Sequence, residues 1–184
     1  MQWTNTPSSY GAVAKFLHWS IVILIIAQYV LAEAAEELPD GIEKLATISR
    51  HKSLGMLVLG LALLRILWKL VSKGQPSPVP MPALQRAAAA AGHGLLYLLV
   101  LAQPISGWMM SSAANYPVSW FGLLQLPNLV MPSEALKEVL EEVHEGLFVA
   151  LLCLAGVHVL AALKHQFVDR DGLITRMLPW GGRG

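Results

Sequence analysis

The sequence predicts an all-α fold, a membrane four-helix bundle with both termini cytoplasmic. Composition gives the first indication, because 55% of the 184 residues are hydrophobic and only 14% are charged. The mean hydropathy of +0.53 points the same way, since soluble domains carry about a quarter charged residues. Four long apolar runs and an uneven distribution of charge between their flanks complete the prediction.

Each apolar run is long enough for a helix that crosses ~30 Å of hydrocarbon, which takes ~20 residues. The expected spans are about 15–35, 48–71, 86–112 and 137–166, within a single transmembrane domain over 1–184. The first run, from Phe16 to Ala32, is too long for a signal-peptide core, and the acidic residues that follow it offer no cleavage site of small residues. It is therefore predicted to be the first span.

Two segments separate the last three spans. "GQPSPVPMP" at 74–82 and "NYPVSWFGLLQLPNLVMP" at 115–132 are rich in residues that break helices. Both are predicted to be loops. The second is apolar and contains Trp120 and Phe121, so we expect it to lie along the membrane interface, where aromatic residues gather.

The charges predict the orientation, because cytoplasmic flanks carry the excess of lysine and arginine. With the N-terminus inside, eight basic residues lie inside and four outside. The inner eight are Lys15, Lys69, Lys73, Arg86, Lys164, Arg170, Arg176 and Arg183. The outer four are Lys44, Arg50, Lys52 and Lys137, accompanied by ten acidic residues between Glu33 and Glu145. Because no basic cluster is combined with aromatic residues, nucleic-acid binding is not predicted.

This orientation sorts four histidines into two depths. His51 and His144 lie at the outer ends of their spans, and His18 and His158 lie toward the inner ends. In a helix the fourteen residues from His144 to His158 turn ~1400°, which is ~40° short of four turns, so both histidines share a face ~21 Å apart. The fourth span therefore contributes one histidine at each depth.

Two histidines at one depth suit haem iron, because the porphyrin supplies the other four ligands and helical bundles build such sites between facing helices. Zinc would need a fuller set of protein ligands. The sequence thus predicts two haems, with iron bound by His51 and His144 on the outer side and by His18 and His158 on the inner side. With Cys153 as the only cysteine, no covalent attachment motif exists, so the haems are predicted to be b-type.

Other residues within the spans have two interpretations each. Gly55, Gly146 and Gly156 lie near the predicted ligands and either leave room for a macrocycle or let helices approach closely. His93 could compete as the inner ligand, but a quinone or propionate contact or a packed imidazole is favoured.

Arg65 lies fourteen residues after His51, at the inner depth. A guanidinium there suits a propionate or a quinone, and the alternative is an arginine that extends toward the headgroups. His165, seven residues after His158, is either a quinone or propionate contact or a headgroup contact.

Five motifs in chain order resemble one family. They are "FLHWS", "RHKSLGMLVLGLALLRILWKL", "GHGLLYLLVLAQPISGWMM", "VHEGLF" and "AGVHVLAALKHQFVDRDGLITRMLP". Together they resemble the bacterial cytochrome b561 family, small four-helix dihaem proteins of the inner membrane. In this resemblance His18, His51, His144 and His158 match the family's ligand positions.

The resemblance implies an electron-transfer oxidoreductase of the cell inner membrane. It would pass electrons between a periplasmic one-electron donor and the quinone pool, with ubiquinone or another quinone as acceptor. Superoxide is a donor for some members, but the ten outer acids would repel an anion.

Two other classes stay open at this point. One is a cytochrome b subunit that anchors a larger dehydrogenase or hydrogenase. The other is a non-redox membrane protein that binds a metal or relays protons. The sequence is compatible with a dimer or a partner subunit.

Overall fold

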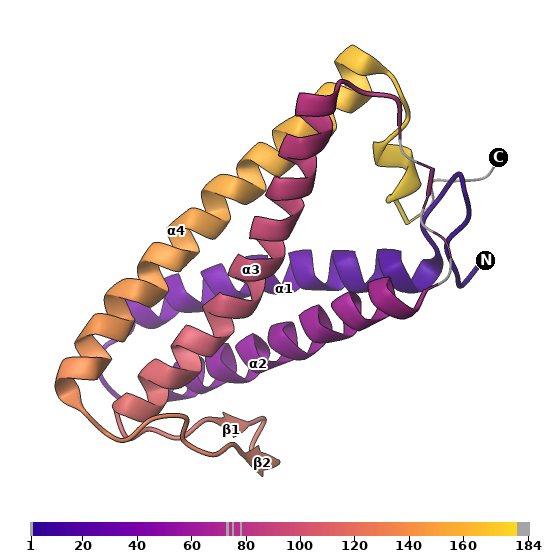
Figure 1. Ribbon diagram of the computed structural model, residues 1–184. Coiled ribbons are helices and arrows are strands. Elements are labelled where there is room, and N and C mark those ends of the chain that lie inside the picture. Colours follow the sequence, from indigo (N-terminus) through magenta and orange to yellow (C-terminus); the bar gives the residue numbers. More distant parts are fainter. Residues whose placement is uncertain (1, 73, 75, 78, 180–184) are drawn as a thin grey trace.

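The structure is a computed structural model that describes residues 2–72, 74, 76–77 and 79–179. Four long helices dominate it (Figure 1). They are α1 (Ala12–Glu37), α2 (Ile42–Val71), α3 (Ala83–Ala113) and α4 (Glu134–Lys164). A small hairpin of β1 (Ser119–Trp120) and β2 (Leu124–Gln125) joins α3 to α4, and a π-helix (His165–Asp169) and a 3-10 helix (Ile174–Arg176) follow α4.

Local sequence explains where the helices begin and end. Pro39 restricts the residue before it to extended backbone, and α1 ends just before that residue, Leu38. Pro82 precedes α3. The Ser133 hydroxyl caps α4 by accepting a 3.3 Å hydrogen bond from the Leu136 N–H. Glu134 in the first turn of α4 favours the same start, because a negative charge is stabilised at a helix N-terminus.

The helices pack as two antiparallel pairs, α1 with α2 and α3 with α4, and α2 joins the pairs by contacting α3. Both pairs meet near the β1–β2 hairpin, which we call the hairpin end, and diverge toward the other end (Figure 1). There the N-terminal segment contacts the C-terminal one: Tyr10 N–H donates to the Arg176 carbonyl oxygen at 3.2 Å. The Trp19 Nε1–H donates to the Met177 carbonyl oxygen at 2.9 Å. We call this the terminal end.

The burial pattern is that of a membrane protein. All four long helices are long and apolar enough to cross a membrane. Large side chains such as Ile23, Leu63 and Leu152 are exposed, each by more than half. The most buried positions in the helices are small, among them Ser53 and Ala62. Small residues let membrane helices approach closely while the large apolar side chains face lipid.

The helices extend beyond the predicted spans by a few residues at most ends, and the fourth continues into the π-helix. The segment 115–132, which was predicted to be a loop, connects α3 to α4 and differs from that prediction in containing a short antiparallel pairing of β1 with β2. Ser53 on α2 holds this hairpin: its hydroxyl donates to the Ser119 carbonyl oxygen and accepts from the Phe121 N–H. Lys73 and Arg183, two of the basic residues used to predict orientation, lie outside the described residues.

Candidate functional site

Two histidines from different helices meet at the hairpin end. The imidazole rings of His51 on α2 and His144 on α4 have centroids 6.5 Å apart and planes inclined by 76°. The contact joins the α1–α2 pair to the α3–α4 pair, because α2 belongs to the first and α4 to the second.

A second pair has nearly the same geometry nearer the terminal end. His18 on α1 and His158 on α4 have ring centroids 6.4 Å apart and planes inclined by 76°. The fold therefore brings together the two pairs that sequence depth predicted. Because α4 is continuous between them, the pairs are separated by fourteen residues, or ~21 Å of helix.

The spacing of both pairs fits two imidazoles that ligate one iron from opposite sides. A metal–imidazole bond is ~2 Å long and the ring centroid lies ~1 Å behind the bonding nitrogen, so the two centroids should be ~6 Å apart. A direct hydrogen bond between the rings would bring the centroids closer. Two histidines in each pair fit haem, which needs only two ligands from the protein.

At the hairpin end, hydrogen bonds hold both rings. His51 Nδ1 lies 3.2 Å from the Gln28 carbonyl oxygen on α1. His144 Nδ1 lies 2.9 Å from the Ser106 hydroxyl, and His144 Nε2 lies 3.2 Å from Gln103 Nε2, both on α3. The side-chain oxygens of Gln28 and Gln103 are buried without a partner among the described residues. Unsatisfied buried amides of this kind indicate a site that receives another group.

At the terminal end the surroundings are cationic and aromatic. The ring of His93 on α3 lies 5.4 Å from that of His158. Arg65 on α2 donates a 2.8 Å hydrogen bond from Nη1 to the Ala14 carbonyl oxygen, and it is close enough to interact electrostatically with His18, His93 and His158. In the described part of the chain, no hydrogen bond reaches the ring nitrogens of His18 or His158.

The glycines near the paired histidines differ in how much space surrounds them. A side chain added at Gly146 or Gly156 would meet nothing within 4 Å, so no close contact requires either glycine. Gly55 instead packs against Gln28, where an added Cβ would come within 2.9 Å of Nε2. The glycine that contacts a paired histidine is Gly107, whose added Cβ would lie 2.9 Å from His144 Cε1.

Sequence reasoning missed Gln28, Gln103, Ser106 and Gly107. The two glutamines carried a usable signal, because a polar amide inside an apolar span needs a partner or a function. Ser106 and Gly107 carried none, since small residues are common wherever membrane helices pack.

His165 lies at the start of the π-helix and is only 8% exposed. Its Nδ1 lies 2.5 Å from Asp171 Oδ2, and its Nε2 lies 3.4 Å from Gln85 Nε2 on α3. Partial burial alone would raise the pKa of the Asp171 carboxyl, but the hydrogen bonds from His165 and the Leu173 N–H lower it below its usual value.

These side chains form an ion-pair network just after α4. Asp169 joins it through a 2.6 Å contact with Lys164 Nζ. His165, Asp169 and Asp171 could together hold a metal ion, but His165 and Lys164 already satisfy the carboxylates.

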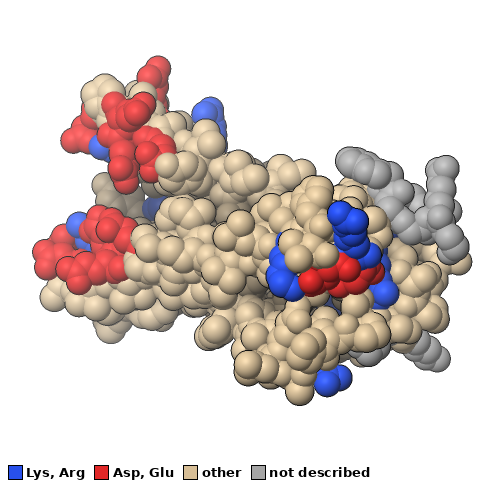
Figure 2. Space-filling view, turned by 90° about the horizontal axis from the view of Figure 1, so that it is seen from above, with Lys and Arg blue, Asp and Glu red and all other residues tan. Residues whose placement is uncertain are grey.

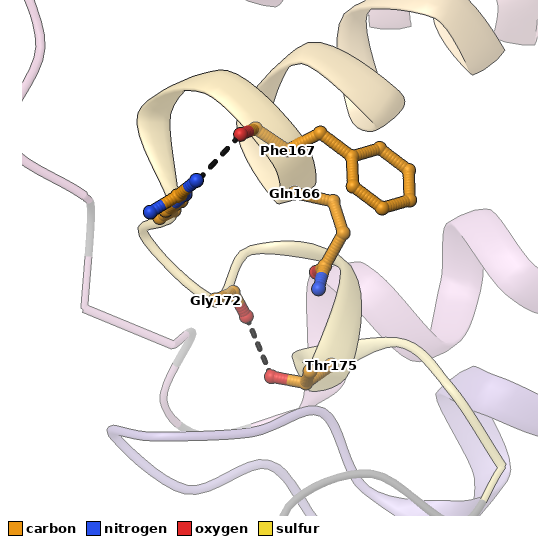
Figure 3. A pocket seen from close by; sticks show the side chains of 5 residues that line it. Gln166, Phe167, Gly172 and Thr175 are labelled. Carbon is orange, nitrogen blue, oxygen red and sulfur yellow. Dashed lines mark hydrogen bonds between the residues drawn. The ribbon is translucent and has the colours of Figure 1, made fainter.

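A cavity of about 360 Å³ adjoins this network (Figure 3). It is lined by Gln166, Phe167, Arg170, Gly172 and Thr175. Two hydrogen bonds shape its wall, from Arg170 Nε to the Phe167 carbonyl oxygen and from the Thr175 hydroxyl to the Gly172 carbonyl oxygen. Gly172 has a φ of 71°, a conformation that favours glycine.

The two ends of the bundle differ in charge (Figure 2). The ten acidic residues of the hairpin end are all exposed and form two groups, one around the α1–α2 turn and one on the first turns of α4. Lys44 pairs with Asp40 and Lys137 with Glu134. A cavity of about 360 Å³ at this end is lined in part by Lys44, Lys52 and Tyr116.

Four apolar spanning helices with two facing histidine pairs define the class of b-type membrane cytochromes. The family described as prokaryotic cytochrome b561 matches residues 9–180, so the chain belongs to the prokaryotic cytochrome b561 family.

Curated relatives agree with this assignment. Cytochrome b561 homolog 2 of Escherichia coli (strain K12) is 35% identical over 183 residues, which cover 97% of this chain and 95% of that protein. Cytochrome b561 homolog 1 of the same organism is 29% identical and covers 89% and 93% of the two chains. The Probable superoxide oxidase CybB of Yersinia pestis is 29% identical and covers 92% and 96%.

Family membership and the four apolar helices establish a multi-pass protein of the inner membrane that acts in electron transfer. The family also implies b-type haem as the cofactor.

Proposed function

We propose that the protein is a dihaem cytochrome that carries electrons from a periplasmic one-electron donor to the membrane quinone pool. In this proposal His51 and His144 ligate one haem at the hairpin end. His18 and His158 ligate the other nearer the terminal end. Bound haem would supply a reversible one-electron couple, and two histidines holding each iron would leave it no position for a further ligand.

One observation carries the proposal: two histidine pairs on different helices share a centroid spacing of 6.4 to 6.5 Å and an interplanar angle of 76°. A chance contact between packed imidazoles has no reason to repeat with the same geometry. Repetition at both ends of α4 is what two equivalent ligation sites require.

The direction of transfer follows from the charge bias. In this proposal the terminal end faces the cytoplasm and the acidic hairpin end faces the periplasm, an orientation that the basic flanks support. A donor in the periplasm therefore meets the His51 and His144 pair first. Quinone reaches the terminal-end pair from the bilayer.

The terminal end has the groups that quinone reduction needs. Each quinone takes up two electrons and two protons, so the donor must deliver one electron twice and the protein must supply protons. His93, beside His158, and His165, paired with Asp171, are the candidate proton carriers. Arg65 is placed to contact a haem propionate or the quinone, because a guanidinium binds oxyanions well.

Two observations about charge bear on the identity of the donor. The name of the Yersinia pestis relative suggests superoxide, and Lys52 beside the hairpin-end cavity gives a local cation for a small anion. The ten exposed carboxylates oppose this, since an anion is repelled by a negative surface. We therefore favour a donor that is neutral or positively charged.

The first test is a haem count on detergent-purified protein. Two haem b per chain by pyridine-haemochrome analysis is the expected result. None would leave the non-redox metal-binding or proton-relaying alternative, and one would refute the second site.

A second measurement addresses the donor and the partner. Protein in liposomes with quinone is mixed with superoxide or with a basic redox protein, and haem reduction is followed optically. Faster reduction by superoxide, even at low ionic strength, would overturn our preference. Co-purification of a stoichiometric basic subunit would favour the anchor-subunit alternative.

A further inference from the structure

The hydrogen bonds around His144 fix which ring nitrogen carries the proton. Ser106 Oγ lies 2.8 Å from the Gln103 carbonyl oxygen, which can only accept, so the hydroxyl proton is used there. Ser106 Oγ also lies 2.9 Å from His144 Nδ1. With its proton committed, the hydroxyl must accept in this second contact. His144 Nδ1 is therefore protonated.

Gln103 leads to the same tautomer by an independent contact. Its amide nitrogen, which can only donate, lies 3.2 Å from His144 Nε2 and 3.1 Å from the His144 carbonyl oxygen. His144 Nε2 is thus the unprotonated nitrogen. On the facing helix His51 Nδ1 lies 3.2 Å from the Gln28 carbonyl oxygen, so His51 is also protonated at Nδ1. The His51 Nε2 lone pair has no hydrogen bond among the described residues. The His144 Nε2 lone pair accepts from Gln103, so the Gln103 amide would have to turn away for iron to bind there.

A ligand imidazole that donates its Nδ1–H to an oxygen becomes a stronger base toward the metal. Stronger donation stabilises ferric over ferrous iron and lowers the reduction potential. The terminal-end pair has no such hydrogen bond among the described residues, and Arg65 places a positive charge near it, which favours the reduced state. The hairpin-end site is therefore expected to have the lower reduction potential of the two. This difference drives electrons from the hairpin end to the terminal end.

We propose that Ser106 is a positioning residue that lowers the potential of the hairpin-end haem through His144 and so directs electrons toward the terminal end. This inference rests on the proposed haem ligation. Ser106 contributes the one side-chain acceptor in the arrangement that can be removed, because the acceptor for His51 is a backbone carbonyl. Ser106 is 6% exposed, so water does not readily replace its hydroxyl.

The test is a potentiometric titration of the purified dihaem protein, followed optically. Ser106→Ala should retain both haems and raise the lower midpoint. The expected shift is about tenfold in the reduction equilibrium, which is ~59 mV for a one-electron couple. Ser106→Thr keeps the hydroxyl and should restore the wild-type midpoint. Ser106→Cys, with a weak acceptor of similar size, should lie between them.

Ser111→Ala is the matched control, because Ser111 is also buried on α3 and its hydroxyl donates to the Tyr116 backbone carbonyl oxygen instead. It should leave both midpoints unchanged. His144→Ala should lose the hairpin-end haem. The midpoint that remains in this variant therefore belongs to the terminal-end haem.

Each outcome decides the inference. If Ser106→Ala holds two haems with wild-type midpoints, the role of Ser106 is refuted while the dihaem proposal stands. If Ser106→Ala loses haem, Ser106→Cys decides, and a wild-type midpoint in that variant refutes the role. A wild-type protein without haem refutes the proposed function itself, and the inference falls with it.

Discussion

The hairpin end and the terminal end contain histidine pairs of almost identical spacing in different surroundings. At the hairpin end, carboxylates cover the surface and hydrogen bonds hold both rings. At the terminal end, Arg65 and His93 approach the pair and the rings lack such hydrogen bonds among the described residues. Equal ring geometry with unequal surroundings means that the neighbouring residues, not the paired histidines, distinguish the two ends.

The largest expected effect is loss of one haem when either member of a pair is removed. His51→Ala and His144→Ala should each abolish the hairpin-end haem, while His18→Ala and His158→Ala abolish the other, because one imidazole cannot replace two axial ligands. Haem counting and redox titration of the four variants would reveal crossed pairing. Any single variant that lost both haems would show that the two sites are not independent.

Among the described residues, His93 has no counterpart at the hairpin end, so its removal should affect one end only. His93→Ala is expected to retain both haems and to slow quinone reduction by ~10², the usual contribution of a positioned proton donor. Stopped-flow reduction of a quinone analogue in liposomes measures this rate. Loss of a haem in this variant would instead identify His93 as an inner ligand in place of a predicted one.

Arg65 should change a potential without changing the haem content. Arg65→Gln removes a positive charge and should lower the terminal-end midpoint by ~40 mV, which corresponds to about 1 kcal/mol in a medium of intermediate dielectric. Arg65→Lys keeps the charge and should retain most of the midpoint, while losing bidentate contact with a propionate. Wild-type midpoints and quinone rates in Arg65→Gln would mean that the arginine only contacts the headgroup region and the Ala14 carbonyl.

The smallest effect concerns the ion-pair network after α4. The pKa of the Asp171 carboxyl is lowered in the folded state, so its ionised form stabilises the fold above the unfolded pKa of ~3.9 and this stabilisation is lost as pH falls through the folded pKa. Asp171→Asn should therefore exchange amide hydrogens around His165 faster than wild type at pH 6. The difference should shrink below pH ~4, and a difference that persisted there would contradict the ionic origin.

Several parts of this molecule could be predicted from sequence and others could not. Helix number and histidine depth follow from hydropathy and from the 3.6-residue period, so the His51–His144 and His18–His158 pairs could be named in advance. The hairpin at 119–125 could not, because two-residue strands carry no periodicity. The contacts of Gln103 and Ser106 with His144 could not be predicted either. They depend on how α3 is rotated against α4, and tertiary packing sets that rotation.

The pairing of His165 illustrates the same limit. A heptad spacing from His158 placed His165 on the same face of an ideal α-helix, but the chain turns into a π-helix at that residue. The wider turn and the left-handed Arg170 that follows bring Asp171 back to the imidazole. Whether the chain forms a π-helix at this point depends on the local hydrogen bonds of the backbone. The pattern of apolar residues does not predict them.

Because one unbroken helix carries a member of each histidine pair, α4 fixes both the distance and the relative rotation between His144 and His158. One residue inserted between His144 and His158 would turn the second imidazole by ~100°, while seven would nearly restore its face but lengthen the gap by ~10 Å. The number of intervening residues is therefore constrained much more tightly than their identity. Outward-facing positions such as Val149, Leu152 and Val157 are exposed, so evolution can adapt them to the lipid without disturbing the electron path.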